Sequence, residues 1–221
     1  MRTPSVSQSY LRYPLSQLLG SAACVRVLRM LCPGGAMGVS ALAGLCGLSR
    51  AGVRIVLESL VVQRLVDQLG AGRSQVYRIN PQHPLAAALE ALFREEQANW
   101  EGLVSALRDA IGGVAGVRAA WYFGSVARGE DRPDSDLDIA LVADEADLEL
   151  VVEAVRERLC WVEDRYLVHC SVVGLSDADV MRLVAAEDPW WQGLARDAKP
   201  LRGELPVYYS YGLKDTTVHT E

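Results

Sequence analysis

Four residues, Gly124, Ser125, Asp136 and Asp138, have types and a spacing that suit chemistry on a phosphate group. Gly124 follows an apolar run and lacks a Cβ, so a phosphate can approach its backbone closely. Ser125 supplies a hydroxyl and begins a predicted helix, whose free N–H groups favour an anion. Asp136 and Asp138 stand two residues apart at the start of a predicted strand, so their side chains share one face. The pattern predicts a site that holds phosphates opposite a pair of carboxylates.

The paired carboxylates indicate a divalent cation. Two carboxylates side by side repel each other, and each raises the pKa of the other. A divalent cation removes this penalty, and Mg²⁺ takes one or two carboxylates together with water and substrate phosphates. We therefore expect Mg²⁺ at Asp136 and Asp138, facing phosphate groups at Gly124 and Ser125. Such an arrangement is typical of a phosphoryl or nucleotidyl transfer site.

The segment around these residues resembles a known family. It contains G-S-x-A-R-G-E and then S-D-L-D-I, with ten residues between the G-S pair and the D-x-D. This pattern is similar to the minimal nucleotidyltransferases of the DNA polymerase β-like superfamily, over about residues 112–202. The resemblance implies transfer of a nucleoside monophosphate from a nucleoside triphosphate (NTP) to an acceptor, with release of pyrophosphate.

The resemblance also implies roles for individual residues. Gly124 and Ser125 would contact the nucleotide, and Asp136 and Asp138 would bind two Mg²⁺ ions as catalytic metal ligands. Arg128 would lie near the phosphates or brace the loop.

The family usually has a third carboxylate on the strand after the following helix. Here the predicted strand 166–173 contains no acidic residue, and His169 or Ser171 falls where the carboxylate is expected. Glu163 and Asp164 precede this strand and would substitute only if it began earlier. Two hypotheses stay open: His169 acts as a catalytic group in an active transferase, or the domain is degenerate and only binds nucleotide.

The second half of the chain alternates strands and helices, which is an α/β pattern. The apolar runs predict strands over 117–123, 137–142 and 166–173, and helices over 145–160 and 177–186. We expect Trp190 and Trp191 to cover the core rather than to stack on a base. With a helical first half, the whole chain is predicted to be α+β with a small mixed sheet.

The first half has the layout of a helix-turn-helix followed by a hairpin. Apolar spacing predicts helices over 15–31 and 39–45, and Ser49 is a suitable N-cap for a third helix through residue 62. Strands at 65–69 and 75–79 with a basic turn at 70–74 would form the wing. This half resembles the winged-helix transcription regulators.

The resemblance to winged helices implies binding to double-stranded DNA. The helix after Ser49 would lie in the major groove with Arg50 and Arg54 exposed, and the wing tip would touch phosphate or the minor groove through Arg73, Ser74 and Gln75. Winged helices also serve as protein-interaction modules, so this alternative stays open.

Charge separates the two halves. Residues 1–80 hold nine arginines and two acidic residues, a net charge of +7, whereas residues 81–221 hold thirteen basic and twenty-six acidic residues, a net charge of −13. We predict an arm (1–14), a winged helix-turn-helix (15–84), a helical linker (85–111), a minimal nucleotidyltransferase domain (112–206) and a tail (207–221). The linker is expected to be one helix or two broken near Gly102, and it is a candidate homodimer interface.

The remaining composition favours a cytoplasmic protein. The five cysteines are scattered without a C-x-x-C pair, which fits reduced thiols better than a disulfide framework. No apolar run approaches the roughly 20 residues that span a bilayer, and the N-terminus lacks the apolar stretch of a signal peptide.

Three functions are compatible with these features. The first is a DNA-bound, Mg²⁺-dependent nucleotidyltransferase that modifies a protein, such as a toxin-like partner, or a small molecule. The second is a winged-helix transcription regulator or antitoxin-like regulator whose second domain only binds nucleotide. The third, an antibiotic-modifying nucleotidyltransferase, is weaker because such an enzyme does not need a basic winged helix.

Overall fold

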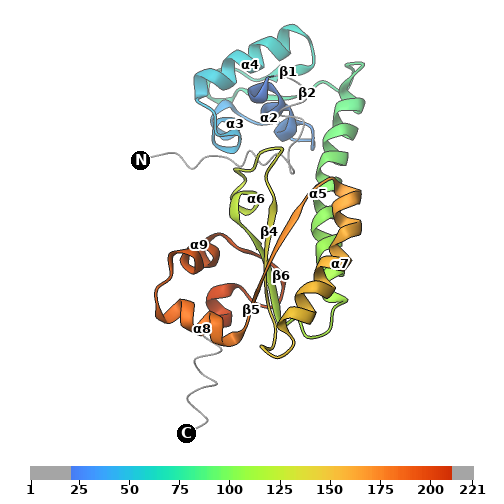
Figure 1. Ribbon diagram of the computed structural model, residues 1–221. Helices are drawn as coiled ribbons and strands as arrows, with labels where there is room; N and C mark the ends of the chain where they lie inside the picture. Colours follow the sequence, from blue (N-terminus) through green and yellow to red (C-terminus); the bar gives the residue numbers. More distant parts are fainter. Residues whose placement is uncertain (1–20, 211–221) are drawn as a thin grey trace. The chain divides into compact units, whose positions relative to one another are not determined.

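The computed structural model describes residues 21–210, which form two compact units that divide between Asn99 and Trp100 (Figure 1). Residues 1–20, which hold the predicted arm and the start of the first predicted helix, lie outside this range, as do residues 211–221 of the predicted tail. The fold is a mixture of helices and strands with one small mixed sheet, so the predicted α+β class is confirmed at this level.

Between residue 21 and the start of α5 at Ala86, the first unit consists mainly of three helices and a two-stranded hairpin. The elements are α2 (Ala22–Leu31), α3 (Val39–Cys46), α4 (Arg50–Val62), β1 (Val66–Leu69), η1 (Gly72–Ser74) and β2 (Val76–Ile79). The strands β1 and β2 pair antiparallel, and Met37 and Tyr77 exchange two backbone hydrogen bonds of 2.9 Å. The three helices meet in a core whose fully buried members include Val27, Leu31, Leu42, Val53 and Leu57.

Local signals set the ends of α3 and α4. Gly47 follows α3 with a left-handed φ of 61°, which glycine adopts without steric penalty. The Ser49 side chain then accepts a hydrogen bond of 3.0 Å from the Gly52 N–H, which confirms the predicted N-cap.

Helix α5 (Ala86–Gly112) is continuous for 27 residues, so the predicted helix has no break near Gly102. Its first part packs on the first unit through Phe93, and its last part is buried in the second unit through Leu107 and Ile111. Packing favours glycine at position 102, because a Cβ there would lie 2.8 Å from the Tyr166 hydroxyl.

The second unit is built on a four-stranded sheet in the order β5-β4-β3-β6. The strands are β3 (Ala119–Phe123), β4 (Leu137–Val142), β5 (Cys170–Leu175) and β6 (Lys199–Arg202), and β4–β5 is the parallel pair in this sheet. Helices α7 (Leu148–Tyr166) and the end of α5 cover one face, while α8 (Asp177–Ala185) and α9 (Pro189–Asp197) cover the other (Figure 1). The second face holds a core around Trp121, whose ring meets Trp191 edge to face at 6.4 Å.

Two predictions in this unit need correction, and two of its elements were not predicted. The predicted strand 166–173 is wrong at its start: α7 continues to Tyr166, because Val155, Leu159 and Val162 keep a helical period on its buried face, and β5 begins only at Cys170. Helix α9 and strand β6 were not predicted. The predicted tail is wrong at its start, because residues 206–210 are helical and the Tyr209 hydroxyl donates a 2.7 Å hydrogen bond to Asp177.

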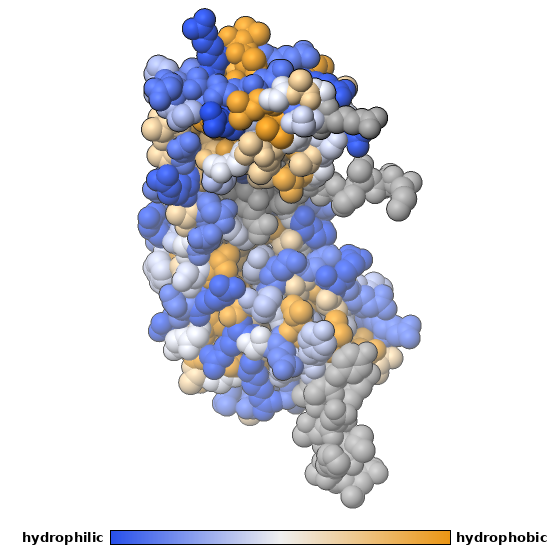
Figure 2. Space-filling model, turned by 180° about the vertical axis from the view of Figure 1, so that it is seen from behind, coloured by the Kyte–Doolittle hydropathy of each residue, from blue (hydrophilic) through white to orange (hydrophobic). Residues whose placement is uncertain are grey.

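On the face shown in Figure 2, apolar residues form separate patches among hydrophilic ones. Within residues 21–210, no helix combines the length and the apolar character needed to cross a membrane. All five cysteines are free thiols. Burial raises the pKa of Cys32 and of Cys170 to about 12, whereas Cys160 is exposed on α7.

Candidate active site

The loop after β3 brings the backbone of Gly124 against the carboxylate of Asp138. Strand β3 ends at Phe123 and the chain turns at once into α6 (Gly124–Arg128), a helix of only five residues. Gly124 has a left-handed φ of 73°, and a Cβ at this position would overlap the Asp138 carboxylate. The turn therefore requires glycine for two reasons. It also brings together Gly124 and Asp138, two of the residues that the sequence singles out.

Strand register places Phe123, Asp138 and Ser171 in one row across the sheet. Phe123 pairs with Asp138 across the antiparallel β3–β4 pair, and Asp138 pairs with Ser171 across the parallel β4–β5 pair. Residues in register on neighbouring strands share a face. Ala140, two residues after Asp138, packs in the core under α8 and α9, so the row belongs to that face.

Asp136 and Asp138 lie close enough for their charges to interact, although β4 begins one residue after Asp136. Partial burial raises the pKa of Asp138, and the negative charge of Asp136 raises it further. The positive charge of Arg128 lowers it but does not cancel the other two effects. The repulsion between these two carboxylates is a cost that a bound cation such as Mg²⁺ would offset.

Two ligating carboxylates fit one Mg²⁺ whose remaining ligands are water and phosphate oxygens. Among residues 21–210, no group of three or more His, Cys, Asp or Glu side chains is placed to hold a metal ion. The neighbour of Asp138 on β5 is Ser171, so a serine stands beside this carboxylate on the next strand. The donor set thus fits a single cation with substrate ligands better than the two-ion site that the resemblance implies.

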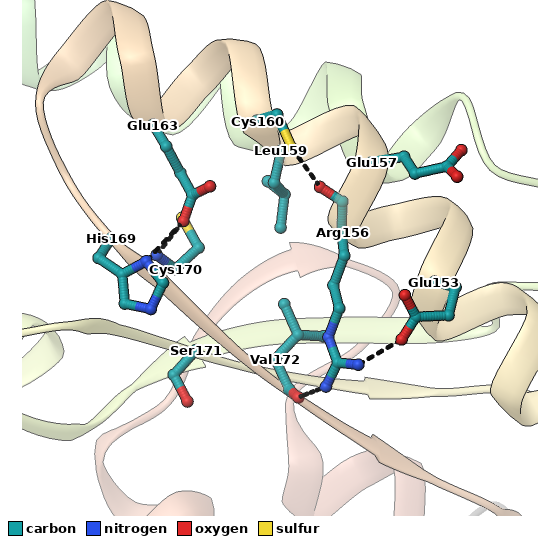
Figure 3. Close-up of a pocket in the computed structure, with 10 residues that line it drawn as sticks. All are labelled: Glu153, Arg156, Glu157, Leu159, Cys160, Glu163, His169, Cys170, Ser171 and Val172. Atoms are coloured by element: carbon teal, nitrogen blue, oxygen red, sulfur yellow. Dashed lines mark hydrogen bonds and ion pairs between the residues drawn. The ribbon is translucent and has the colours of Figure 1, made fainter.

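His169 does not join this row. It lies just before β5 with its side chain 74% exposed, and its Nδ1 is 3.0 Å from Oε1 of Glu163 on α7 (Figure 3). The same Glu163 oxygen accepts the Cys170 N–H at 2.7 Å. Both contacts hold Glu163 at the junction of α7 and β5, so it does not complete the pair of Asp136 and Asp138.

An open groove of about 500 Å³ lies between α7 and β5 and is bordered by Glu163, His169 and Cys170 (Figure 3). Arg156 of α7 crosses it and donates a 3.2 Å hydrogen bond to the Val172 carbonyl on the edge strand.

Arg128, at the end of α6, is held by two carboxylates. Its Nε is 2.9 Å from Glu130 Oε2, and its Nη1 is 3.2 Å from Asp197 Oδ2. Asp197 is the last residue of α9 and its side chain is only 11% exposed. Sequence reasoning missed Asp197, and no local signal could have found it, because it lies 69 residues from Arg128 and meets it only through the packing of α6 on α9.

The two tryptophans of α9 differ. Trp191 is buried against Trp121, as predicted for a core residue. Trp190 is 38% exposed, and its ring meets Phe123, the residue before Gly124, edge to face at 5.6 Å.

The residues predicted to bind DNA lie on α4 and the hairpin of the first unit. Arg50 and Arg54 are exposed and stand one helical turn apart. The other polar side chains have internal partners: the Ser49 oxygen caps α4, the Ser74 hydroxyl donates to the Ala71 carbonyl, and Gln75 donates to the Tyr77 hydroxyl. Arg73 lies in η1 at the tip of the hairpin.

A protein-family model matches part of the second unit. Residues 108–182 match the family described as "Polymerase beta, Nucleotidyltransferase", a stretch that includes Gly124, Arg128, Asp136 and Asp138. This stretch of the chain is therefore similar to nucleotidyltransferase domains of the polymerase β type.

Solved structures similar to the chain include a toxin-antitoxin with AMP-PNP, at 18% identity and a TM-score of 0.32, covering 54% of this chain and 86% of that chain. A mutant of the toxin-antitoxin MntA-HpeT matches at 17% identity and the same TM-score, with the same coverage of both chains. A search of curated proteins finds no significant match.

Proposed function

We propose that the protein is a nucleotidyltransferase that transfers a nucleoside monophosphate from an NTP to a protein or small-molecule acceptor and releases pyrophosphate. The observation that carries the proposal is the contact of the Gly124 backbone with the Asp138 carboxylate at the β3–α6 turn. The missing Cβ lets the Asp138 carboxylate lie against the backbone of the turn, and Arg128 adds a positive charge near the two carboxylates, where a phosphate would bind. Mg²⁺ held by Asp136 and Asp138 would supply the charge that a triphosphate needs as pyrophosphate leaves.

The first prediction concerns the paired aspartates. The Asp136→Ala/Asp138→Ala variant is expected to lose label transfer from α-labelled NTPs with Mg²⁺, because it removes both predicted metal ligands. Transfer is measured across candidate protein and small-molecule acceptors. The Asp134→Ala variant, in the exposed loop before β4, is the matched control and should keep wild-type transfer. If the wild type and the double variant both fail to transfer label to any of these acceptors, the proposal of an enzyme loses its support.

A nucleotide-binding domain without turnover is the alternative. The observation that favours it is Ser171, which stands beside Asp138 where the resemblance leads us to expect a third carboxylate. In that case the wild type binds NTP with an affinity that depends on Asp136 and Asp138 but labels no acceptor.

We further propose that the first unit is a winged helix that binds double-stranded DNA. The exposed arginine pair of α4 and the arginine-bearing tip of the hairpin support this proposal. In this arrangement DNA binding only determines where the protein acts. The acidic second half of the chain repels DNA from the catalytic face, so we propose that the acceptor is a molecule other than DNA.

The second prediction tests DNA binding through its salt dependence. Binding of the full chain to random duplex DNA should weaken as salt rises. Arg50→Ala and Arg54→Ala should each lower affinity and reduce the slope of log K against log salt by about one. Glu153→Gln on α7 is the control and should leave the slope unchanged. Absence of binding at low salt, or slopes that both arginine variants leave unaltered, would contradict the DNA proposal.

A further inference from the structure

Asp197 holds two arginines beside the candidate active site. Its Oδ2 is 3.2 Å from Arg128 Nη1, and it also accepts hydrogen bonds of 2.8 Å and 3.1 Å from Nε and Nη2 of Arg196. The Asp197 side chain is 11% exposed, whereas the side chains of Arg128 and Arg196 are 39% and 73% exposed. One nearly buried carboxylate thus anchors two guanidinium groups that face solvent.

The Asp197 carboxylate is charged under ordinary conditions. The hydrogen bond from Arg196 is the largest cause that lowers its pKa, and the contact with Arg128 lowers it further. Because ionised partners form stronger hydrogen bonds than neutral ones, this carboxylate fixes both arginines more firmly than a neutral acceptor would.

The position of Arg128 gives this anchor a role in the site. Arg128 belongs to a helix that packs against β4, the strand that carries Asp138. Arg128 also ends α6, the helix that begins at Gly124. A guanidinium group so placed lies next to the position where the triphosphate is proposed to bind.

We propose that Asp197 is a positioning residue that holds Arg128 and Arg196 as a pair for the polyphosphate of the nucleotide. The inference rests on the proposed function and extends it to α9, which lies beyond the matched residues 108–182. Arginine is suited to phosphate because its fork of N–H donors binds phosphate oxygens in pairs. Held in place beforehand, the two long side chains lose less freedom when the ligand binds.

Asp197 has a second effect of opposite sign, which makes the proposal testable. Its negative charge repels a polyphosphate, so removal of the charge alone would tighten binding. If positioning dominates, Asp197→Asn weakens binding instead, because the two arginines lose their common anchor. Glu130→Gln provides the comparison, since Glu130 contacts the same guanidinium from a side chain that is 57% exposed.

The experiment measures the Kd of the full chain for tripolyphosphate with Mg²⁺ by calorimetry. Asp197→Asn is expected to raise the Kd about tenfold, the usual effect of losing a hydrogen bond between charged groups. Glu130→Gln should raise the Kd less or lower it, and Glu153→Gln, in a distant exposed ion pair on α7, should leave it unchanged. In a double-mutant cycle, Asp197→Asn should have a much smaller effect on an Arg128→Lys background, because it acts through Arg128.

The outcomes separate this inference from the proposed function. If the wild type binds tripolyphosphate and Asp197→Asn binds equally or more tightly, the positioning role is wrong while the nucleotide site stands. If the wild type binds neither tripolyphosphate nor NTP, the proposed function and this inference both fail. If Asp197→Asn does not fold, Asp197→Glu keeps the charge but moves it by one methylene, and an unchanged Kd in that variant would overturn the inference.

Discussion

Replacing Glu96 by glutamine is expected to lower the free energy of unfolding of the first unit by about 3–5 kcal/mol, as for other buried ion pairs that lose one charge. Glu96 and Arg29 form a two-pronged pair, with Arg29 Nε 2.6 Å from Oε2 and Nη2 3.0 Å from Oε1. Their side chains are 4% and 10% exposed, and the guanidinium also lies over the Phe93 ring at 5.7 Å. The variant removes the negative charge that faces the buried guanidinium of Arg29.

The two units can be followed separately in one unfolding experiment. All five tryptophans, at positions 100, 121, 161, 190 and 191, belong to the second unit, so their fluorescence reports on that unit. Circular dichroism reports on the helices of both. We expect Glu96→Gln to shift the dichroism transition in urea and to leave the fluorescence transition nearly in place.

Two controls sharpen this prediction. The Arg29→Met/Glu96→Met variant removes both charges, and its stability should return close to that of the wild type or exceed it. Glu153→Gln disrupts the exposed pair with Arg156, whose side chains are 58% and 50% exposed, and should change stability by about 0–1 kcal/mol. A loss below about 1 kcal/mol for Glu96→Gln would mean that water reaches the pair.

Sequence reasoning located the parts of the candidate site that depend on neighbouring residues. The turn at Gly124 follows from an apolar run that ends in Gly-Ser, and strand β4 has the predicted bounds. The cap at Ser49 was also predictable, because a serine before a helical apolar period satisfies the first free N–H groups.

The parts that depend on packing between distant segments could not be predicted in the same way. The sequence placed His169 or Ser171 where a third carboxylate is expected and favoured His169 as the catalytic residue, whereas the β4–β5 register puts Ser171 beside Asp138. The start of β5 was misplaced because residues 166–173 are rich in β-branched and aromatic types, which favour a strand. The buried face of α7 overrides that preference up to Tyr166. Asp197 depends on the position of α9, which was not predicted.

The structure also changes the meaning of the charge asymmetry. With the division after Asn99, the first unit has ten arginines and five acidic residues, a net charge of +5, and the second has twelve basic and twenty-three acidic residues, a net charge of −11. One of the ten arginines, Arg29, is buried against Glu96 and offers nothing to a polyanion. The pair Arg50 and Arg54, by contrast, is exposed and available to contact DNA phosphates.

Replacing Gly124 by alanine is expected to abolish NTP-dependent label transfer and to destabilise the second unit. The left-handed backbone alone costs an L-residue about 1–2 kcal/mol. The added methyl group would also overlap the Asp138 carboxylate and force it away from its position beside Asp136. The lowered stability should appear in the fluorescence transition, and the lost site should appear as absent nucleotide binding at a temperature where the variant is still folded.

Gly193→Ala is the matched control, because the two glycines lie in the same unit and differ in what a Cβ would meet. Gly193 lies within α9 without a positive φ, and a Cβ there would meet nothing within 4 Å. That variant should gain about 0.5–1 kcal/mol in the free energy of unfolding, because alanine is the better helix former, and should keep label transfer.

If folded Gly124→Ala binds nucleotide with wild-type affinity, the contact of Gly124 with Asp138 is not what forms the site. The triphosphate would then have to bind away from the β3–α6 turn.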